Sequence, residues 1–521
     1  MKALNIFAGL DPSLQTGEVV TSSPSTETVA AGAVAKDPRR WLALAVIASS
    51  QLMVILDASI VTIALPSAQR DLGISDADRQ WVVTAYTLAF GGLLLLGGRI
   101  ADYAGRKRAL LIGLGGFAFA SALGGLAGNA ELLFAARALQ GAFAALLAPA
   151  ALALITVTFT EPRERAKAFS VVGGIAGGGA AIGLVLGGIL TEYASWRWCL
   201  GVNVPVAIIA ILVILFAIPI VKESKAQGST KYDIPGAVLS TLGLVSLVYG
   251  FTQAAKPDVG WGAASTIGFL VAAGVLLVAF VLWERRTTNP LLPLRIALDR
   301  NRGGSYLVFL LVGAGLFAMF LFLTFYLQIV LQYSPLRASA ALLPFSAGII
   351  VGAGLMSQLM PKLGPKPLMV TGLALATIGM LWLTQIDADT SYATHVLPSQ
   401  LVMSLGMAAV FVPASSTALI GIDPHDAGVG SALLNTTQQI GGSLGTALLN
   451  TLYAGAVTSY LVAHAGLAPR VAQVEALIHG YRVAFFWGAV FIALALVVAV
   501  VLINAKKDDI PADATAAAVP A

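Results

Sequence analysis

The chain has 521 residues, of which 58% are hydrophobic and 11% carry a charge, and its mean hydropathy is +0.85. This composition excludes a set of soluble domains and indicates a polytopic membrane protein. The net charge of +5 does not indicate a nucleic-acid partner, because the basic residues lie in short loops between apolar stretches. The single cysteine, Cys199, excludes an intrachain disulfide, and the scattered histidines have no metal-ligand spacing.

Residues 1–40 are rich in Ser, Thr, Gly and Ala and contain no apolar core of signal-peptide length, so we expect a disordered cytoplasmic tail. Apolar stretches of the roughly 17 to 25 residues that cross a bilayer follow this tail. There are fourteen of them, at residues 41–66, 79–98, 109–128, 131–155, 170–192, 199–219, 234–254, 262–283, 304–331, 338–360, 367–386, 396–421, 428–453 and 480–503. The sequence therefore predicts an all-α membrane protein with both termini on one side.

The lysines and arginines identify that side. Of these residues, 23 lie in the two tails and in the loops that share a side with them, seven lie in the opposite loops, and Arg137 lies inside a span. Because basic residues favour the cytoplasmic side of a membrane, both termini are predicted to be cytoplasmic. The segment 504–521, made largely of Ala, Asp, Pro and Lys, is expected to be a second disordered tail.

The first span contains a carboxylate, Asp57, deep within the apolar run at residues 51–66. A charged side chain in the middle of a membrane costs several kcal/mol, so an acidic residue at such a depth is a candidate functional residue that needs a partner. The other acidic residues fall in loops, tails and the ends of spans. If one side chain carries a proton here, it is Asp57.

Arg137 in the fourth span is the candidate partner. At about 1.5 Å per residue, Asp57 lies about 13 Å and Arg137 about 9 Å from the outer ends of their spans, which is within one helical turn of the same depth. Equal depth allows the two side chains to pair but does not establish a contact. Burial disfavours the charged form of Asp57 and a neighbouring guanidinium favours it, so a substrate or a movement of the helices can tip the balance.

A weak internal repeat divides the spans into halves. The loop at residues 98–108, after the second span, has a shorter counterpart at residues 361–366, after the tenth span. Many transporters are built from such repeats, with the substrate site between the halves. The sequence therefore predicts an N-terminal six-helix bundle at 41–219, an inserted helix pair with flanking loops at 220–303 and a C-terminal six-helix bundle at 304–503.

Five separated segments carry a resemblance to a known family. They are Leu56-Asp57-Ala-Ser-Ile-Val-Thr-Ile-Ala-Leu65-Pro66, the loop at 98–108, Arg137-Ala-Leu-Gln140-Gly141, residues 179–188 and residues 435–442. In their order and placement the chain resembles the major facilitator superfamily and, within it, the fourteen-span drug:proton antiporters that include quaternary-ammonium and multidrug efflux pumps. The resemblance implies two six-helix bundles plus two extra transmembrane helices. It also implies a proton-coupled exporter of lipophilic, cationic drugs in the cell membrane, which works by alternating access and uses the proton gradient without a cofactor.

The resemblance assigns Asp57 as the proton carrier and Arg137 as its partner. The alternative is a permanent structural ion pair that never titrates, since such pairs also occupy membrane interiors.

The resemblance also assigns a cytoplasmic gate to the loop after the second span. Its residues are Gly98, Asp102, Gly105, Arg106 and Lys107. Asp102 would pair with the basic residues and so stabilise one conformation of the transporter. The alternative is that these charges only set the topology. Tyr103 stands where the family usually has a basic residue.

Glycines recur on one face of the fifth span, at Gly179, Gly183 and Gly187, and Gly188 follows them. This spacing allows the backbone of a neighbouring helix to approach closely. The functional interpretation is a tight seal against proton leak, and the alternative is ordinary small-residue packing. Leu184 stands where the family's motif usually has proline.

Substrate contacts are predicted from polar and aromatic side chains in the middle of spans. The candidates are Gln51, Tyr86, Gln140, Asn203, Phe317, Phe325, Asn435 and Gln438. The ninth span carries aromatic side chains on every face, which is more often core packing or lipid contact than a binding cage. Asp57 would be the anionic group deep enough to meet a cation.

Other function classes lack their sequence signals. No Gly-Lys pair occurs in the sequence, which excludes the phosphate-binding loop of an ATP-driven pump, and neither an enzyme's nucleophile and base nor a channel's charge rings are present. Export of an endogenous lipid or secondary metabolite and a non-transporting sensor or scaffold remain alternatives. We expect the partners to be a lipophilic small-molecule substrate, protons and membrane lipids, with no nucleic acid and no nucleotide, and we expect a monomer.

Overall fold

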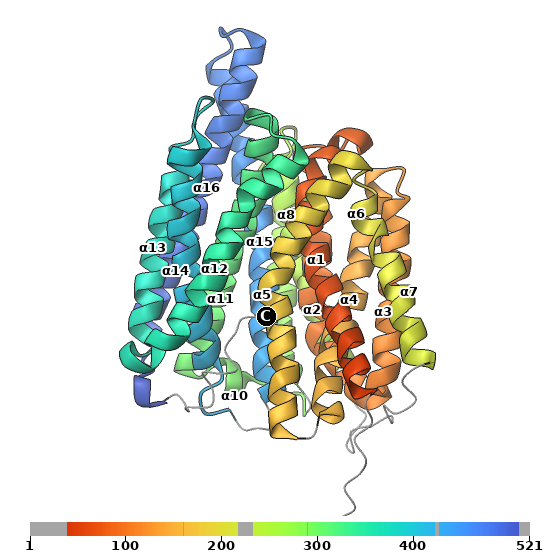
Figure 1. Ribbon diagram of the computed structural model, residues 1–521. Helices are drawn as coiled ribbons and strands as arrows, with labels where there is room; N and C mark the ends of the chain where they lie inside the picture. The colour runs from red at the N-terminus through yellow and green to blue at the C-terminus, as the bar shows by residue number, and fades with distance from the viewer. Residues whose placement is uncertain (1–38, 160, 217–232, 289, 423–426, 510–521) are drawn as a thin grey trace, which may run out of the picture. The chain divides into compact units, whose positions relative to one another are not determined.

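The computed structural model describes residues 39–159, 161–216, 233–288, 290–422 and 427–509, and these are mostly helical (Figure 1). The first group of helices is α1 (Arg40–Leu72), α2 (Trp81–Ala104), α3 (Arg106–Gly125), α4 (Ala130–Thr158), α5 (Pro162–Tyr193), α6 (Trp198–Gly201) and α7 (Asn203–Phe216). Next come α8 (Ile234–Ala254), α9 (Ala264–Glu284) and α10 (Leu294–Ala297). The second group is α11 (Arg300–Phe325), α12 (Pro335–Leu363), α13 (Pro365–Leu383), α14 (Leu397–Ala418), α15 (Ala427–Ala463) and α16 (Pro469–Leu502). The short elements η1 (Tyr326–Val330), η2 (Tyr392–Val396) and η3 (Lys507–Asp509) extend or follow these helices.

Helical structure covers most of each apolar stretch that was predicted to cross the membrane. Within the described residues, twelve helices are long and apolar enough to span a bilayer. The two other long helices are α5, in which Gly178–Tyr193 forms a shorter apolar segment, and α15, which contains the polar run at residues 435–439. The protein is therefore a multi-pass, all-helical membrane protein.

The helix ends differ from the predicted ends in several places. α1 continues through Pro66 to Leu72, because neighbouring helices can satisfy the backbone group that a proline leaves without its partner. Residues 504–509, assigned from composition to a disordered tail, are ordered, and the backbone N–H of Asn504 donates to Asn301 Oδ1 at 2.8 Å. The other expected tail residues, 1–38 and 510–521, and residues 217–232 lie outside the described residues.

The helices pack mainly within the two groups. In the first group α4 contacts both α2 and α3, and α5 runs along α1; in the second group α11 contacts α15 and α16, and α14 contacts α12 and α13. Two extensive helix contacts join the groups, α2 with α15 and α5 with α12, and α1 makes smaller contacts with α11 and α12. We call the α2–α15 contact the seam. Thr87 and Ser443 hydrogen bond across it, with 2.6 Å between their hydroxyl oxygens.

The inserted helices α8 and α9 form a pair, and α8 lies against both sides of the seam. Gln80 Nε2 donates to Thr252 Oγ1 at 2.8 Å, and Thr451 Oγ1 donates to the carbonyl oxygen of Phe251 at 2.7 Å. α9 leaves many apolar side chains uncovered, such as Val275 at 63% exposure. An exposed apolar surface of this kind is expected of a helix that faces lipid.

Close packing in the first group depends on glycine at one position in α4. A Cβ atom added to Gly141 would overlap the carbonyl oxygen of Tyr86 in α2. A backbone group cannot turn aside as the end of a side chain can, so this contact requires glycine. It fixes α4, and with it the polar side chains of α4, against α2.

We expect Gly141→Ala to lower the free energy of unfolding by about 1–3 kcal/mol, the usual cost of overpacking a packed interior. The measurement is the Tm of the purified protein in detergent. Gly115→Ala in α3 is the matched control, because a Cβ at Gly115 meets no atom within 4 Å and alanine favours a helix more than glycine does. Equal Tm values for the two variants would contradict the close contact.

Candidate functional site

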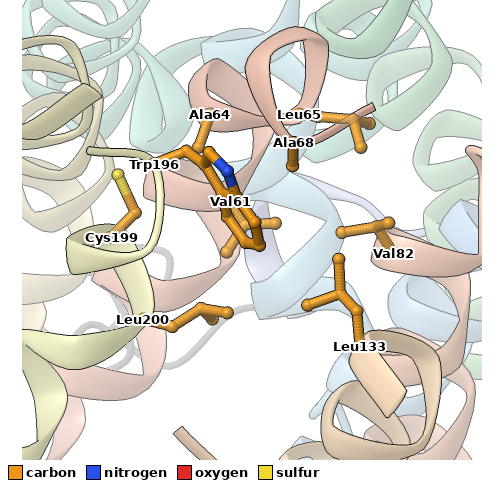
Figure 2. Close-up of a pocket in the computed structure, with 9 residues that line it drawn as sticks. All are labelled: Val61, Ala64, Leu65, Ala68, Val82, Leu133, Trp196, Cys199 and Leu200. Atoms are coloured by element: carbon orange, nitrogen blue, oxygen red, sulfur yellow. The ribbon is translucent and has the colours of Figure 1, made fainter. Parts of the chain in front are cut away.

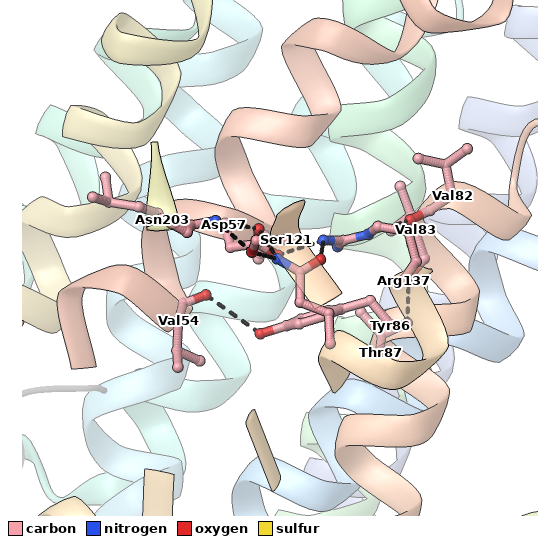
Figure 3. A network of polar contacts seen from close by, with 12 residues as sticks. Val54, Asp57, Val82, Val83, Tyr86, Thr87, Ser121, Arg137 and Asn203 are labelled. Atoms are coloured by element: carbon pink, nitrogen blue, oxygen red, sulfur yellow. Dashed lines mark hydrogen bonds and ion pairs between the residues drawn. The ribbon is translucent and has the colours of Figure 1, made fainter. Parts of the chain in front are cut away.

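Asp57 lies on α1 and forms a buried ion pair with Arg137 of α4 (Figure 3). Arg137 Nη1 donates to Asp57 Oδ2 at 2.5 Å, and neither side chain is more than 1% exposed. Equal depth in the membrane did not establish a contact between Asp57 and Arg137. The structure brings the two side chains together. Pairing offsets the loss of hydration that each charge suffers on burial.

Two side-chain amides complete the hydrogen bonds of the carboxylate. Gln140 Nε2 and Asn203 Nδ2 donate to Asp57 Oδ1 at 2.7 Å and 2.9 Å. Both amides also donate to Ser121 Oγ, and Gln140 Oε1 accepts a hydrogen bond from Arg137 Nη1 at 2.5 Å. We call Asp57, Ser121, Arg137, Gln140 and Asn203 the Asp57 cluster.

Arg137 has further contacts with α2. Its Nε donates to the carbonyl oxygen of Val82 at 2.9 Å, and its guanidinium carbon lies 4.4 Å from the centre of the Tyr86 ring. The Tyr86 hydroxyl donates to the carbonyl oxygen of Val54 at 3.4 Å. A carboxylate, an amide, a backbone carbonyl and a ring therefore fix the guanidinium in one position.

Local sequence places the α4 residues of the cluster. α4 begins after Asn129, whose side chain accepts from the backbone N–H of Leu132 at 2.8 Å and so caps the helix. Arg137 and Gln140 stand three residues apart, which puts them on one face of α4. In the part of the chain that the structure describes, all side-chain hydrogen bonds to Asp57 come from α4 and α7, within the first group.

The chemistry of the cluster follows from its donors. All three groups that contact the Asp57 carboxylate are donors, so a proton added to either oxygen would displace one of them. Because Asp57 has no exposed surface, its carboxylate has no direct contact with solvent in this conformation.

An apolar region lies next to the cluster, on the side of Trp196, which stands between α5 and α6. A small cavity there is lined by Val61, Ala64, Leu65, Ala68, Val82, Leu133, Trp196, Cys199 and Leu200 (Figure 2). Trp196 Nε1 donates to Asp71 Oδ2 at 3.0 Å, which holds the indole in place. A buried water needs two to four polar partners, so this apolar lining closes the cluster off on that side.

Three of the predicted substrate contacts, Tyr86, Gln140 and Asn203, gather at Asp57. Gln51 does not join them, and its Nε2 donates instead to the carbonyl oxygen of Ala148 at 2.8 Å.

The remaining predicted contacts lie on the second group. Asn435 and Gln438 are half-buried on α15, Phe317 packs against Gly442, and Phe325 is fully buried. The structure does not bring these four side chains to the Asp57 cluster. Much of the aromatic run of α11 is core, as its composition suggested.

The predicted gate loop forms a local ion pair. Gly105 separates α2 from α3 with a φ of +106°, a value that favours glycine. Arg106 then follows, and its Nη2 lies 3.0 Å from Asp102 Oδ1. Gly98 lies on α2 facing α4, and Lys107 is half-buried at the start of α3.

The predicted glycine face of α5 packs closely on α1. Gly179, Gly183 and Gly187 face α1, and Gly188 faces α12. A Cβ added to Gly187 would lie 2.9 Å from the carbonyl oxygen of Ile60. α5 therefore covers the segment of α1 that carries Asp57.

One buried charge was not identified from the sequence. Arg79, the first residue of the second predicted span, was counted only among the seven basic residues on the outer side. The structure buries it to 1% exposure, with its guanidinium carbon 4.1 Å from the centre of the Phe325 ring. An arginine at the end of a span is ordinary in the sequence of a membrane protein. Its ring partners become apparent only when α2 and α11 are placed together.

Residues 47–446 match the family model described as Major Facilitator Superfamily. The chain is 49% identical over 488 residues to a puromycin resistance protein of Streptomyces alboniger, and the aligned region covers 93% of this chain and 95% of that protein. It is 38% identical over 423 residues to a cephamycin export protein of Amycolatopsis lactamdurans, covering 81% of this chain and 86% of that protein. Among solved structures it is similar to an inward-facing, unoccupied bacterial homologue of the human lysosomal transporter Spinster, with a TM-score of 0.65, 16% identity, and coverage of 91% of this chain and 99% of that chain.

A helical membrane protein with a buried ion pair and two joined groups of helices has the organisation of a secondary transporter. The chain belongs to the Major Facilitator Superfamily. It is a membrane transporter and not an enzyme. The likeness to the solved structure, at 16% identity, supports the fold alone.

We expect Arg137→Ala to lower the free energy of unfolding by about 3–5 kcal/mol, because it leaves the Asp57 carboxylate buried without its charged partner. The measurement is thermal unfolding in detergent. Arg106→Ala is the control, since it removes a partly exposed pair and should cost at most about 1 kcal/mol. Equal losses of stability in the two variants would contradict a costly unpaired carboxylate, whereas partial recovery of Arg137→Ala by Asp57→Asn would support it.

Proposed function

We propose that this protein is a proton-coupled exporter of lipophilic, cationic antibiotics. The resistance and export proteins to which it is similar support the export of antibiotics. Puromycin carries a primary amine that is protonated at neutral pH, which suits a transporter whose deepest charged acceptor is Asp57. Quaternary-ammonium compounds are further candidates.

The Asp57 cluster is the observation that carries the proposal. A proton that binds the Asp57 carboxylate must displace a donor, and displacing Arg137 Nη1 would break the ion pair. A cationic substrate would also need to displace Arg137 from the Asp57 carboxylate. It would therefore compete with the proton for the same group. Tyr86, Gln140 and Asn203 would then contact the charged part of the substrate. Binding of either occupant would therefore exclude the other, which is the requirement for antiport.

Proton exchange at Asp57 requires a second conformation, since the carboxylate has no exposed surface in this one. Alternating access supplies it. The seam and the α5–α12 contact hold the two groups together, and opening them would uncover the inner faces of α1 and α4. The glycine face of α5 would meanwhile seal α1 against proton leak.

We further propose fourteen spans in the cell membrane, arranged as two six-helix bundles and the inserted pair α8–α9, with both termini cytoplasmic. The excess of lysine and arginine in the loops on the side of the termini supports this orientation. No cofactor is needed beyond the proton gradient, and the two bundles close on each other within one chain, which suits a monomer.

A second candidate is the export of a secondary metabolite that the cell itself makes. The similarity to a cephamycin export protein favours it. The two candidates share one machinery and differ in the compound that is carried, so a compound panel separates them.

We expect puromycin to release protons from the purified protein in weakly buffered detergent, and Asp57→Asn to abolish both this release and efflux driven by a pH gradient in proteoliposomes. Asparagine keeps the size of the side chain but cannot carry a proton. The control is Asp387→Asn, which removes an exposed ion pair with Arg482 in the second group and should leave both signals intact. Undiminished efflux by Asp57→Asn would show that the ion pair has only a structural role.

For the gate, we propose that the Asp102–Arg106 pair stabilises one end state of the transport cycle. We expect Asp102→Ala to reduce the turnover number severalfold while expression and Tm stay near those of the parent, because an exposed pair contributes at most about 1 kcal/mol to stability. Turnover and Tm are measured on the same proteoliposome preparation. Loss of expression in proportion to activity would assign the loop charges to topology alone.

A further inference from the structure

Arg79 is a second buried cation, and its surroundings differ from those of Arg137. It lies just before α2 and is 1% exposed. Its charged partner is Asp76, whose carboxylate oxygen lies 3.4 Å from Nη1 and whose side chain is 52% exposed. Its Nε donates to Asn450 Oδ1 of α15 at 3.2 Å. No buried carboxylate contacts Arg79 in the described residues.

Aromatic rings surround the Arg79 guanidinium instead. Its central carbon lies 4.1 Å from the ring centre of Phe325, 4.6 Å from that of Tyr453 and 5.9 Å from that of Phe322. Tyr481 stacks on Tyr453 with 5.2 Å between ring centres. We call Phe322, Phe325, Tyr453 and Tyr481 the aromatic cage, and all four side chains are fully buried.

The polar groups of the cage interact mainly with one another, since the Tyr453 hydroxyl lies close to both Arg79 and the Tyr481 hydroxyl. The hydroxyl oxygens of Tyr453 and Tyr481 and the Nη2 atom of Arg79 are buried and have no hydrogen bond of normal geometry in the described structure. Such groups are costly in a protein interior, so each one calls for an explanation. The two hydroxyl oxygens can accept hydrogen bonds from a cation that lies over the ring faces. The cage therefore offers a cation both ring faces and acceptors.

The cation and the cage come from different groups of helices. Arg79 belongs to the loop that leads into α2, whereas the cage is built from α11, α15 and α16. Asn450 binds that loop as well, since its Nδ2 donates to the carbonyl oxygen of Asp76 at 2.9 Å. Separation of α2 from α15 at the seam therefore withdraws Arg79 and leaves the cage without a cation.

We propose that the aromatic cage is a binding site for the cationic group of the exported compound, and that Arg79 is a built-in cation that occupies this site whenever the seam is closed. The proposal rests on the alternating access proposed above. Ring faces attract organic cations, both ammonium and guanidinium groups, and the guanidinium is the more weakly hydrated of the two. An amine-bearing or quaternary-ammonium cargo belongs to this class.

The two occupants exclude each other, because both would lie against the same ring faces. When the seam closes, Arg79 re-enters the cage and displaces the cargo. The site would then serve release, whereas the Asp57 cluster couples transport to protons.

The test uses Arg79→Ala, which leaves the cage empty, and the probe ethylguanidinium, which reproduces the missing end of the arginine side chain. We expect ethylguanidinium to raise the Tm of Arg79→Ala in a saturable manner and to leave the parent unchanged. N-ethylurea has nearly the same shape without the charge and should have no effect on either protein. Arg197→Ala is the matched control, because Arg197 also lies over a ring, that of Trp196 at 4.5 Å, but is partly exposed and outside the cage.

A second measurement addresses the cargo. We expect Arg79→Ala to bind puromycin about tenfold more tightly than the parent does, a factor in the range of a desolvated cation–π contact. Adding Phe325→Leu should remove this gain. If Arg79→Ala does not fold, Arg79→Gln replaces it in both measurements.

The outcomes separate this proposal from the proposed function. The cage is refuted if ethylguanidinium gives Arg79→Ala no stabilisation. Tetramethylammonium serves as a second cargo probe beside puromycin. If ethylguanidinium binds Arg79→Ala, but Arg79→Ala binds each of these two compounds no more tightly than the parent does, the cage only stabilises the closed seam. The cage is then refuted as a cargo site. Asp57→Asn should leave the ethylguanidinium result unchanged, so the test of the cage stands even where proton coupling fails.

Discussion

A buried carboxylate needs donors, and the donors of Asp57 come from helices far apart in the sequence. Asp57 lies in α1, and its three hydrogen bonds reach Arg137 and Gln140 in α4 and Asn203 in α7. Because an unpaired charge in the interior costs several kcal/mol, these helices are restricted to one arrangement around the carboxylate. The close approach of α4 to α2 at Gly141 serves the same end, since it holds α4 where its side chains reach Asp57.

The two buried arginines show how one kind of charge can be held in two ways. Arg137 is paired with a carboxylate inside one group of helices, so its bonds can persist while the groups move as units. Arg79 is held by rings that belong to the opposite group. Cation–π contacts are weaker than a buried ion pair and are made without an opposite charge. A contact between groups that has to break in each cycle is better built from rings, because its loss leaves no buried carboxylate uncompensated.

The sequence predicted the helices and indicated Asp57 and Arg137 as candidate partners for a physical reason. An apolar layer about 30 Å thick imposes apolar runs of about 20 residues, and charges such as Asp57 and Arg137 are conspicuous within them. It did not predict the partners of the polar side chains. Gln140 and Asn203 were interpreted as substrate contacts, but they hydrogen bond to Asp57 in this conformation, and only packing could reveal that. Arg79 was missed because charges are expected at the ends of spans, and its rings lie far along the chain.

The position of α8 has a consequence for the surrounding bilayer. Thr252 bonds to the segment before α2, and the adjacent residue, Phe251, bonds to α15. Neighbours in one helix cannot separate, so if α2 and α15 part as the proposed alternating access requires, one of these bonds would break and the pair α8–α9 would travel with the other partner. α9 exposes its apolar surface, so the perimeter of the protein changes as that helix moves. Under the proposed alternating access, lipids beside α9 would rearrange in every cycle, and the stiffness of the membrane would become a mechanical load on transport.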